Sequence, residues 1–472
     1  MKSLNISFVN FYKCAKIGES GYKNRAVLIK NIPGLYVKLQ MALYAKKIIR
    51  FISAVIISAS CSPSKKIPDP AAIVKRPITL PPKQDAPVSV ITKSADDIFF
   101  EGMFRNDPAT FEKIFRNKTD LNVQIIYTEI AKRPGGKQEF TNHYFNKGGS
   151  GYFYPASAIK LPLAILALQK LNTLKDKGIF RNTTMITGSA YSGQTEVYND
   201  PNTPDGKPSL EQYIKRALLV NENDACNRLY EFLGQVYINT ELKKHGYENA
   251  EILHRLGPDL TEDENRHTNP ISFYDNNNVL IYKQPAQNNL KTYSKRKDFS
   301  GKSYLNNGKL IQKPMNMSEK NSISLESLHR MLISVYYPSG RPDISPFSIT
   351  EDDRSFLLKL MQQDPGESAY PYYAGEAYNG YTKYMYFGGE KYKGKKLQSF
   401  NTSGTAYGQM TDAAIIKDPE KNIEFIISAT IYCNSDGILN DDKYDYDKTG
   451  MPFFKSLGKA AYDYELKKTG RK

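Results

Sequence analysis

The sequence predicts a mixed α/β fold, and three patterns support this prediction. The first is an almost wholly apolar stretch at 154–168, which is too long for an ordinary strand and favours a buried helix. The second is a pair of strand-like stretches joined by a Pro-Gly-Gly turn. The third is a pair of apolar strands near the end of the chain, followed by a helical pattern. The strands are expected at 122–130, 140–145, 410–416 and 423–432, and the last helix at 452–466.

Length and composition restrict what this chain can be. Its 472 residues can form one large domain or two ordinary ones, and 40% hydrophobic residues suffice for a core. The net charge of +16 raises the question of a polyanionic partner. The lysines are scattered, however, and no zinc-finger or RNA-binding signature accompanies them, so we attribute the charge to the surface and expect no nucleic acid. The four cysteines form no CxxC pair and the five histidines no HExxH motif, so we expect no metal or other cofactor.

The stretch from Met41 to Cys61 has the layout of a secretory signal peptide. A basic region precedes a short apolar run at 51–57, and small residues stand directly before the cysteine. The apolar run is too short to cross a bilayer. The small residues resemble a bacterial lipoprotein cleavage box, although Ile57 and Ser58 depart from its usual leucine-led form. A diacylated Cys61 would tether the chain to a membrane leaflet; an uncleaved anchor and a plain secretory signal are the alternatives.

This layout divides the chain into four parts. Residues 1–40 are interpreted as non-native sequence upstream of the true start, and 41–61 as the lipoprotein signal. Residues 62–95 are rich in proline, serine and lysine, which is typical of an extended tether. The folded domain is expected at 96–472. Together these parts predict a lipid-anchored protein of the bacterial membrane, either periplasmic or on the cell surface.

Within the domain, local signals place further elements in order. Asp107 followed by Pro108 predicts a helix that ends at Arg116, with the aspartate as its N-cap. A second helix is expected from Ser209, where apolar residues recur on one face. Residues 271–321 are an insertion that opens with a hairpin signal and continues as a loop rich in lysine, asparagine and tyrosine. A helical pattern then resumes at residue 323 and continues to residue 335.

Two polar side chains, Ser157 and Lys160, stand at the start of the apolar helix. Residues three apart share a helix face, so the hydroxyl and the amine can meet. Burial disfavours the charged form of lysine, and we expect a mostly uncharged amine that removes the hydroxyl proton and creates a nucleophile. The spacing alone is weak, because four other Ser-x-x-Lys pairs occur without such a helix. The alternative is structural: the serine caps a core helix and the lysine extends its amine to solvent.

The stretch 154–168 resembles the nucleophile helix of the class A β-lactamase and penicillin-binding protein superfamily of serine acyltransferases. A second motif of that superfamily, a Ser-Asp-Asn loop ahead of a helix, has its counterpart in Asn221-Glu222-Asn223. The resemblance implies that the Asn223 amide faces the substrate and the lysine. The superfamily's serine relays a proton to the leaving nitrogen, and here Asn221 replaces it, although an amide cannot shuttle protons as a hydroxyl does. Without that context, the stretch is an ordinary polar junction between helices.

The third motif of the superfamily, Lys-Thr-Gly on an edge strand, matches Thr402-Ser403-Gly404. Thr402 replaces the lysine that normally supplies positive charge for a substrate carboxylate. The resemblance implies that Ser403 contacts this carboxylate or moves a proton, and that Gly404 lets the substrate backbone come close. The backbone N–H groups of Ser157 and Thr405 would form the oxyanion hole. Taken by itself, the stretch is simply a turn.

Class A enzymes also carry a glutamate that activates the deacylating water, between the second and third motifs. Glu262 and Glu264 lie in this interval, and Glu264 is the catalytic candidate that we retain. Neither glutamate lies in a Glu-x-x-Leu-Asn sequence, and a solvated loop charge is the competing interpretation. The insertion at 271–321 follows, and we expect it to overhang the site and restrict which substrates enter.

The three motifs occur in the order that the resemblance requires. The resemblance therefore implies an α/β (α+β) sandwich, in which an antiparallel sheet is flanked by helices and an all-helical half is inserted in the chain. It also implies an active-site-serine hydrolase that acts on a β-lactam or a peptidoglycan-derived amide or ester, with Lys160 as general base. The changes at Asn221 and Thr402 leave an alternative open: a non-catalytic or penicillin-binding surface lipoprotein that uses the same fold as a binding module.

Overall fold

The computed structural model of the chain describes residues 94–132, 138–149, 151–291, 296–338, 345–373, 380–391 and 397–470. The expected upstream extension, the signal with Cys61 and the tether up to residue 93 lie outside the described residues. The described part begins at Ser94, whose hydroxyl accepts a hydrogen bond from the N–H of Asp97 and caps helix α2 (Ala95–Met103). The folded part thus includes two residues that we had assigned to the tether. None of the described helices is long and apolar enough to cross a membrane.

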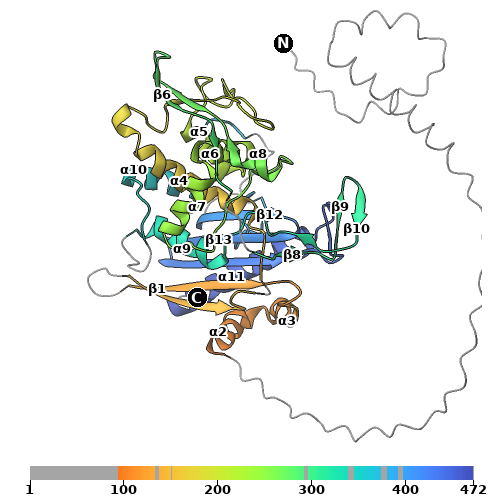
Figure 1. Ribbon diagram of the computed structural model, residues 1–472. Coiled ribbons are helices and arrows are strands. Elements are labelled where there is room, and N and C mark those ends of the chain that lie inside the picture. Colours follow the sequence, from red (N-terminus) through yellow and green to blue (C-terminus); the bar gives the residue numbers. More distant parts are fainter. Residues whose placement is uncertain are drawn as a thin grey trace, which may run out of the picture. The chain divides into compact units, whose positions relative to one another are not determined.

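An antiparallel sheet of five strands forms the centre of the described domain (Figure 1). Its strand order is β12-β13-β14-β1-β2, so β14, from near the end of the chain, pairs with the first strand, β1. The strands span Gln124–Lys132 (β1), Gln138–Phe145 (β2), Gln398–Ala406 (β12), Gln409–Asp418 (β13) and Ile423–Tyr432 (β14). The strands expected from the sequence are confirmed, and the predicted third motif lies on β12 at the edge of the sheet.

Different helices cover the two faces of the sheet, because alternate residues of a strand point to opposite sides. On one face Tyr127 and Phe425 pack with Phe454 of α11 (Met451–Lys468) and with α2. Helix α3 (Pro108–Arg116) joins this layer, and its predicted N-cap is confirmed, because the Asp107 carboxylate accepts from the N–H of Thr110. On the other face Ile126 and Ala413 pack with the helical half. The predicted arrangement of a sheet flanked by helices is therefore confirmed (Figure 1).

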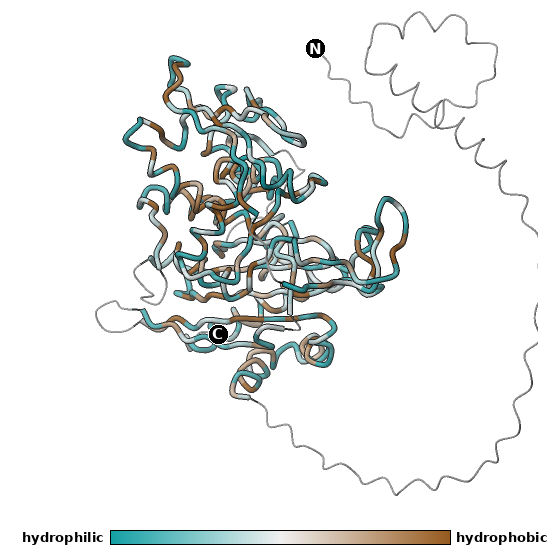
Figure 2. Tube along the Cα trace, in the orientation of Figure 1, coloured by the Kyte–Doolittle hydropathy of each residue, from teal (hydrophilic) through white to brown (hydrophobic). Residues whose placement is uncertain are grey.

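The helical half is built around α4, in which all but two of the thirteen residues are buried. A helix that is apolar all round must lie inside the protein, and Figure 2 shows hydrophobic stretches of chain gathered in this part of the structure. The helices are α4 (Lys160–Asn172), α5 (Leu210–Leu219), α6 (Asn223–Leu233), α7 (Gln235–Lys244), α8 (Glu262–Arg266), α9 (Leu325–Tyr336) and α10 (Glu351–Gln362). Shorter helical turns lie at Phe104–Asn106 (η4), Lys175–Lys177 (η7), Pro365–Glu367 (η8) and Tyr446–Gly450 (η9).

The insertion folds into short strands, where the sequence indicated a loop after the hairpin. The hairpin itself is confirmed: β5 (Ile271–Tyr274) pairs with β6 (Leu280–Gln284), and β5 also pairs with β3 (Thr184–Thr187). The other short strands are β4 (His267–Thr268), β7 (Gln287–Asn288), β8 (Phe299–Ser300), β9 (Ser303–Asn306), β10 (Lys309–Ile311) and β11 (Met315–Asn316). β9 pairs in parallel with β15 (Ile438–Leu439), which follows β14, so the insertion is fastened to the end of the sheet (Figure 1).

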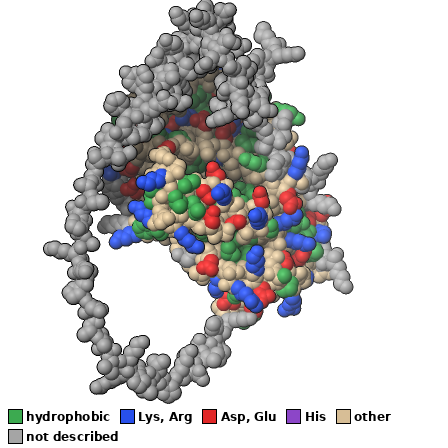
Figure 3. Space-filling view, turned by 90° about the vertical axis from the view of Figure 1, so that its right-hand side faces the viewer, with side chains coloured by type: hydrophobic (Ala, Val, Ile, Leu, Met, Phe, Trp, Pro, Cys, Tyr) green, Lys and Arg blue, Asp and Glu red, His purple; other side chains and the backbone are tan. Residues whose placement is uncertain are grey.

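The side of the domain that carries β9 and β10 has a mixed charge pattern. Figure 3 looks at this side and shows lysine and arginine side chains interspersed with aspartate and glutamate. Because charges of opposite sign alternate over short distances, their fields largely cancel at the range over which a polyanion would be attracted. The described residues that are visible on this face therefore form no continuous basic surface.

Candidate active site

A tight turn presents Ser157 at the start of the buried helix. Residues Ala156–Ile159 form a single 3₁₀ turn (η6), which is closed by a 3.0 Å hydrogen bond from the Ala158 N–H to the Pro155 carbonyl. Ala156 has φ +48°, a left-handed conformation that costs a non-glycine residue about 1–3 kcal/mol. Such strain persists only where the surroundings hold the backbone, and α4 behind the turn is held by the core. The turn therefore fixes the half-buried serine at the start of α4.

Lys160 lies with its amine directly against the Ser157 hydroxyl. Its Nζ is 2.6 Å from Ser157 Oγ, 2.7 Å from the backbone oxygen of Asn221 and 2.8 Å from Oδ1 of Asn223. The side chain is only 1% exposed. The alternative interpretation, in which this lysine extends its amine to solvent, is therefore wrong. The structure brings together three of the residues that the sequence nominated, around one nitrogen atom.

The three contacts suit either protonation state of the amine. An ammonium has three N–H donors, which serve the two carbonyl oxygens and Ser157 Oγ. A neutral amine keeps two donors for the carbonyl oxygens and turns its lone pair toward the serine, which then donates its own proton. Loss of a proton from Lys160 thus reverses only the bond to Ser157. The lysine becomes a base without any change in its position.

Burial sets the protonation equilibrium of this lysine. Desolvation of the charged form lowers the pKa of Lys160 to about 8, while nearby Cys226 and Glu222 act in the opposite direction. With this pKa, about a tenth of the amine is neutral at pH 7. The expectation of a mostly uncharged amine is therefore corrected: at neutral pH the base is the minor form, and it becomes the major form only above pH 8.

The junction between α5 and α6 supplies both oxygen partners of the lysine. Asn221 has φ +55°, which asparagine tolerates better than most residues, and its carbonyl oxygen reaches Lys160. Its side chain does not line the cleft, so its contribution is positional rather than the catalytic one for which it was nominated. Asn227, one turn beyond Asn223, bonds both backbone groups of Leu256 at 2.8–2.9 Å. It therefore holds the opposite wall of the site at a fixed distance.

Strand β12 passes close to the turn that bears the serine. A Cβ atom on Gly404 would lie 2.3 Å from the oxygen of Pro155 and 2.8 Å from the nitrogen of Ser157, so this contact requires glycine. Thr402 is 6% exposed, and its hydroxyl donates to the Ala158 oxygen at 3.4 Å. From the sequence we expected the backbone of a substrate to come close to Gly404. In the structure the protein's own turn occupies that side of the glycine.

Ser403 points away from the turn that bears Ser157, because Thr402 and Gly404 on either side of it contact that turn. It is 3% exposed and donates to the Thr382 oxygen at 2.7 Å. Its predicted contact with a substrate carboxylate is therefore wrong. Thr405 does line the cleft beside Ser157, and its hydroxyl donates to Tyr384 Oη at 3.0 Å. The backbone of Thr405 thus lies next to the nucleophile, where the predicted oxyanion hole requires it.

These groups open into a cleft of about 600 Å³. Ser157 and Thr405 form its base, with Asn223 beside them, and residues 254–259 form one wall. The insertion supplies further lining residues, which we call the roof of the cleft, and the expectation that it restricts which substrates enter stays a prediction. The roof and rim residues are Tyr304, Leu305, Asn306, Asn307, Met315 and Lys320, together with Tyr407 after β12 and Asn440 after β15.

Glu264 is not among the residues that line this cleft. Its carboxylate accepts from the N–H and the hydroxyl of Thr261, each at 2.8 Å, and from the Ser192 hydroxyl at 2.8 Å. It completes a capping box at the start of α8, and these hydrogen bonds lower its pKa. Glu262 pairs instead with Arg266 at 2.9 Å. The nomination of Glu264 as the deacylation base is therefore corrected to a structural role.

Three polar residues of the cleft were missed in the sequence. Asp259 is exposed and is the only carboxylate among the described residues that line the cleft. His254 donates from Nδ1 to the Arg255 oxygen at 2.6 Å, and burial lowers the pKa of this histidine to about 4, so it is neutral at physiological pH. Lys320 belongs to the insertion. No local sequence pattern identifies these residues. The abundance of lysine and asparagine in the insertion was the one signal, and it applies to Lys320.

Comparisons with known proteins identify the family to which this chain belongs. A sequence model of the beta-lactamase enzyme family matches residues 109–464. Among solved structures, the chain is similar to PBP-A, with 13% identity, coverage of 75% of this chain and 96% of that chain, and a TM-score of 0.41. It is similar to a class A beta-lactamase from Clostridium kluyveri DSM 555, with 15% identity, 76% and 98% coverage, and a TM-score of 0.40. No curated protein sequence matches the chain.

Proposed function

The chain belongs to the β-lactamase enzyme family, and from this premise we propose that it is an active-site-serine acyl hydrolase. Its substrate is a β-lactam or a related amide or ester of the cell wall, and the reaction passes through an acyl group on Ser157. The observation that supports this proposal most strongly is the 2.6 Å contact between Lys160 Nζ and Ser157 Oγ. The other two hydrogen-bond partners of the amine are carbonyl oxygens, so among its described hydrogen-bond partners only the Ser157 hydroxyl can give up a proton.

Acylation follows from this contact. The neutral Lys160 amine accepts the hydroxyl proton while Ser157 Oγ bonds to the substrate carbonyl carbon. The backbone N–H groups of Ser157 and Thr405 stabilise the negative charge that develops on the carbonyl oxygen. The bond from that carbon to the leaving nitrogen or oxygen then breaks, and the leaving atom takes a proton. Because the Asn221 amide cannot relay one, the Lys160 ammonium is the donor, directly or through a water molecule.

Hydrolysis of the acyl-serine needs a base for the attacking water, and the described residues that line the cleft include no buried carboxylate for this step. Glu264 and Glu262 are bound elsewhere, and Asp259 is exposed to solvent. We therefore infer that acylation is faster than deacylation and that the acyl-serine is long-lived. This feature favours a penicillin-binding role over rapid β-lactam turnover, and it makes that role the second candidate function.

The place of action is proposed from the sequence alone. The signal-like stretch that ends at Cys61 supports a lipid anchor, and the proline-rich residues 62–93 would hold the domain away from the membrane. A membrane-tethered domain would meet cell-wall material or β-lactams in the periplasm or at the cell surface. This location fits the proposed substrates.

Benzylpenicillin is expected to add its full mass to the chain once, because opening of the β-lactam ring releases no group. Intact-mass spectrometry measures this adduct. Ser157→Ala abolishes it, whereas Ser456→Ala retains it. Ser456 is a matched control, since it has the same Ser-x-x-Lys spacing with Lys459 on α11 but lies outside the cleft. Absence of an adduct with both benzylpenicillin and a fluorophosphonate would favour the non-catalytic binding module.

The rate constant for acylation is expected to rise with pH and to level off above pH 8, because only the neutral form of Lys160 accepts the proton. Below the pKa the rise is about tenfold per pH unit. Stopped-flow mixing with a chromogenic cephalosporin gives the profile. Lys170 also has a pKa lowered to about 8, but it bonds the end of α6, so Lys170→Gln keeps the same midpoint. A profile that is flat between pH 6 and 9 contradicts the role of Lys160.

Glu264→Gln is expected to leave both acylation and the lifetime of the adduct unchanged, while the melting temperature falls through loss of the capping box. Asp259→Asn is the comparison variant: it prolongs the adduct, because it removes the only carboxylate among the described lining residues. Time-resolved intact mass after removal of free benzylpenicillin measures both lifetimes. A longer adduct lifetime in Glu264→Gln restores the original assignment of that glutamate.

The mature chain isolated from a bacterial membrane is expected to begin at Cys61 and to exceed its peptide mass by the mass of the attached lipid. Cys61→Ser shifts the protein to the soluble fraction or leaves the signal uncleaved. Mass spectrometry of the N-terminal peptide decides the matter. A mature chain that begins after Cys61, or an unmodified cysteine, refutes the lipid anchor.

A further inference from the structure

The third motif leaves the cleft without the positive charge that its lysine would supply. Thr402 is uncharged, buried and bonded to the Ala158 oxygen, and Ser403 points to the other side of the strand. A substrate carboxylate would therefore enter a cleft whose base offers it hydroxyl, amide and backbone groups but no cationic side chain from β12. A cation for such a substrate has to come from another element.

Two cationic residues are among the described residues that line the cleft, and one of them is already committed. Arg255 is 4% exposed. Its guanidinium donates to Glu231 Oε1 at 2.8 Å and to Asn269 Oδ1 at 3.2 Å. It also donates to the backbone oxygens of Glu264 and His267 at 3.0–3.1 Å. Arg255 therefore stabilises the wall of the cleft and cannot turn to a ligand.

Lys320 is the other cation, and its ammonium is available. The side chain is half-buried on the rim, with Nζ 6.0 Å from the centre of the Tyr407 ring. Tyr407 makes an edge-to-face contact with Tyr154, with the ring centres 5.0 Å apart. Along the chain, Tyr407 stands two residues after Thr405, and Tyr154 stands three residues before Ser157. Among the described residues, no carboxylate forms an ion pair with Lys320. Its charge therefore stands at the aromatic edge of the cleft that Ser157 and Thr405 also line.

Acidic residues lie near Lys320, and one of them, Asp259, also lines the cleft. A smaller hollow of about 180 Å³ is lined by Asp259, Glu262 and Glu319 together with Lys320. Glu262 is held by Arg266 at 2.9 Å, and Asp259 and Glu319 are exposed, where water and salt screen their charge. An anion in the cleft can therefore contact the ammonium without displacing a protein partner.

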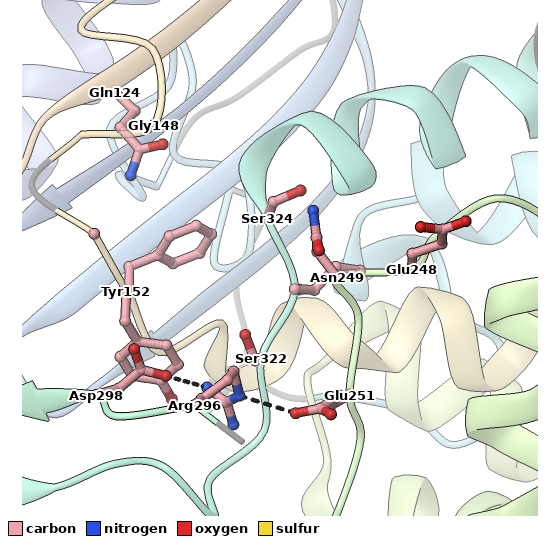
Figure 4. A pocket seen from close by; sticks show the side chains of 13 residues that line it. Gln124, Gly148, Tyr152, Glu248, Asn249, Glu251, Arg296, Asp298, Ser322 and Ser324 are labelled. Carbon is pink, nitrogen blue, oxygen red and sulfur yellow. Dashed lines mark hydrogen bonds and ion pairs between the residues drawn. The ribbon is translucent and has the colours of Figure 1, made fainter. Parts of the chain in front are cut away.

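The backbone that bears Lys320 is held firmly, as an anchoring residue requires. Arg296 donates to Glu251 at 2.9 Å, to Asp298 at 2.6 Å and to the Lys320 oxygen at 2.6 Å. Figure 4 shows Arg296 between the two carboxylates, in a second cavity that Ser322 and Ser324 also line. Glu251 and Ser322 also exchange backbone hydrogen bonds at 2.7–2.8 Å. The segment is thereby joined to the wall that contains residues 254–259.

We propose that Lys320 binds the carboxylate of the substrate and that the acyl donors of this cleft are anionic. The inference rests on the proposed function and deepens it: the positive charge that is missing from β12 is supplied by the insertion. The substrate class is a β-lactam, or a peptide-derived amide or ester, with a carboxylate near the bond that is broken. The uncharged side chains of Asn306, Asn307 and Asn440 on the roof supply hydrogen-bonding groups for the remainder of the molecule.

The test compares benzylpenicillin, which has a carboxylate, with its methyl ester, which has none. In the full chain, Lys320→Gln is expected to lower the second-order rate constant for acylation by benzylpenicillin about tenfold to a hundredfold, as the loss of one charge-assisted hydrogen bond implies. The rate constant for the ester stays unchanged. Lys309→Gln is the matched control, since it removes the same charge from an exposed site on β10 outside the cleft. An equal loss for both compounds, or no loss for either, overturns the proposal.

A binding measurement separates this inference from the proposed function. In the Ser157→Ala background, titration calorimetry with benzylpenicillin is expected to show the same loss of affinity on Lys320→Gln. If the parent chain is not acylated but its Ser157→Ala variant binds benzylpenicillin in a Lys320-dependent way, the anchor stands and the hydrolase proposal fails. If the parent is acylated and neither rate nor binding depends on Lys320, the hydrolase stands and the anchor fails. Absence of both acylation and binding overturns both.

Discussion

The site depends on the burial of a single amine among three oxygen atoms. A buried ammonium is costly unless all of its donors are bonded, and here Ser157, Asn221 and Asn223 bond all three. The arrangement requires that the start of α4 and the junction between α5 and α6 meet at a fixed distance. The apolar surface of α4 provides this, since it locks the helix into the core that α5 and α6 share. Hydrophobic packing thus positions the polar chemistry.

The edge strand β12 is the second constraint, and it is held from both faces. On one face Gly404 touches the turn that bears the serine. On the other, Ser403 and Asn401 both donate to the Thr382 oxygen, and Asn401 also donates to buried Asp412 at 2.9 Å. Burial raises the pKa of Asp412 to about 6, although hydrogen bonds favour its charged form. The residues of the third motif therefore act mainly as structure, and they fix the backbone that faces the nucleophile.

The features that could be predicted from the sequence are those that short-range patterns of residues determine. The buried helix, the strands, the N-cap at Asp107 and the start of a helix at Ser209 follow from patterns within a few residues, and the contact of Ser157 with Lys160 follows from helix geometry. The roles of Ser403 and Glu264 could not be predicted in this way. Which side of β12 faces the cleft is set by pairing with β13, and the partners of Glu264 include Ser192, 72 residues away. Such contacts leave no local pattern in the sequence.

The separation between core and insertion has a consequence for specificity. The nucleophile and its base lie on elements that the hydrophobic core fixes, whereas the proposed anion site lies on a segment fastened by the polar contacts of Arg296 and by the pairing of β9 with β15. A cation on β12 would be as rigid as the sheet. A cation on the insertion can change position through sequence changes in the insertion that leave the core packing intact. Selection of the substrate can therefore vary in this fold while the proton transfer between Lys160 and Ser157 stays constant.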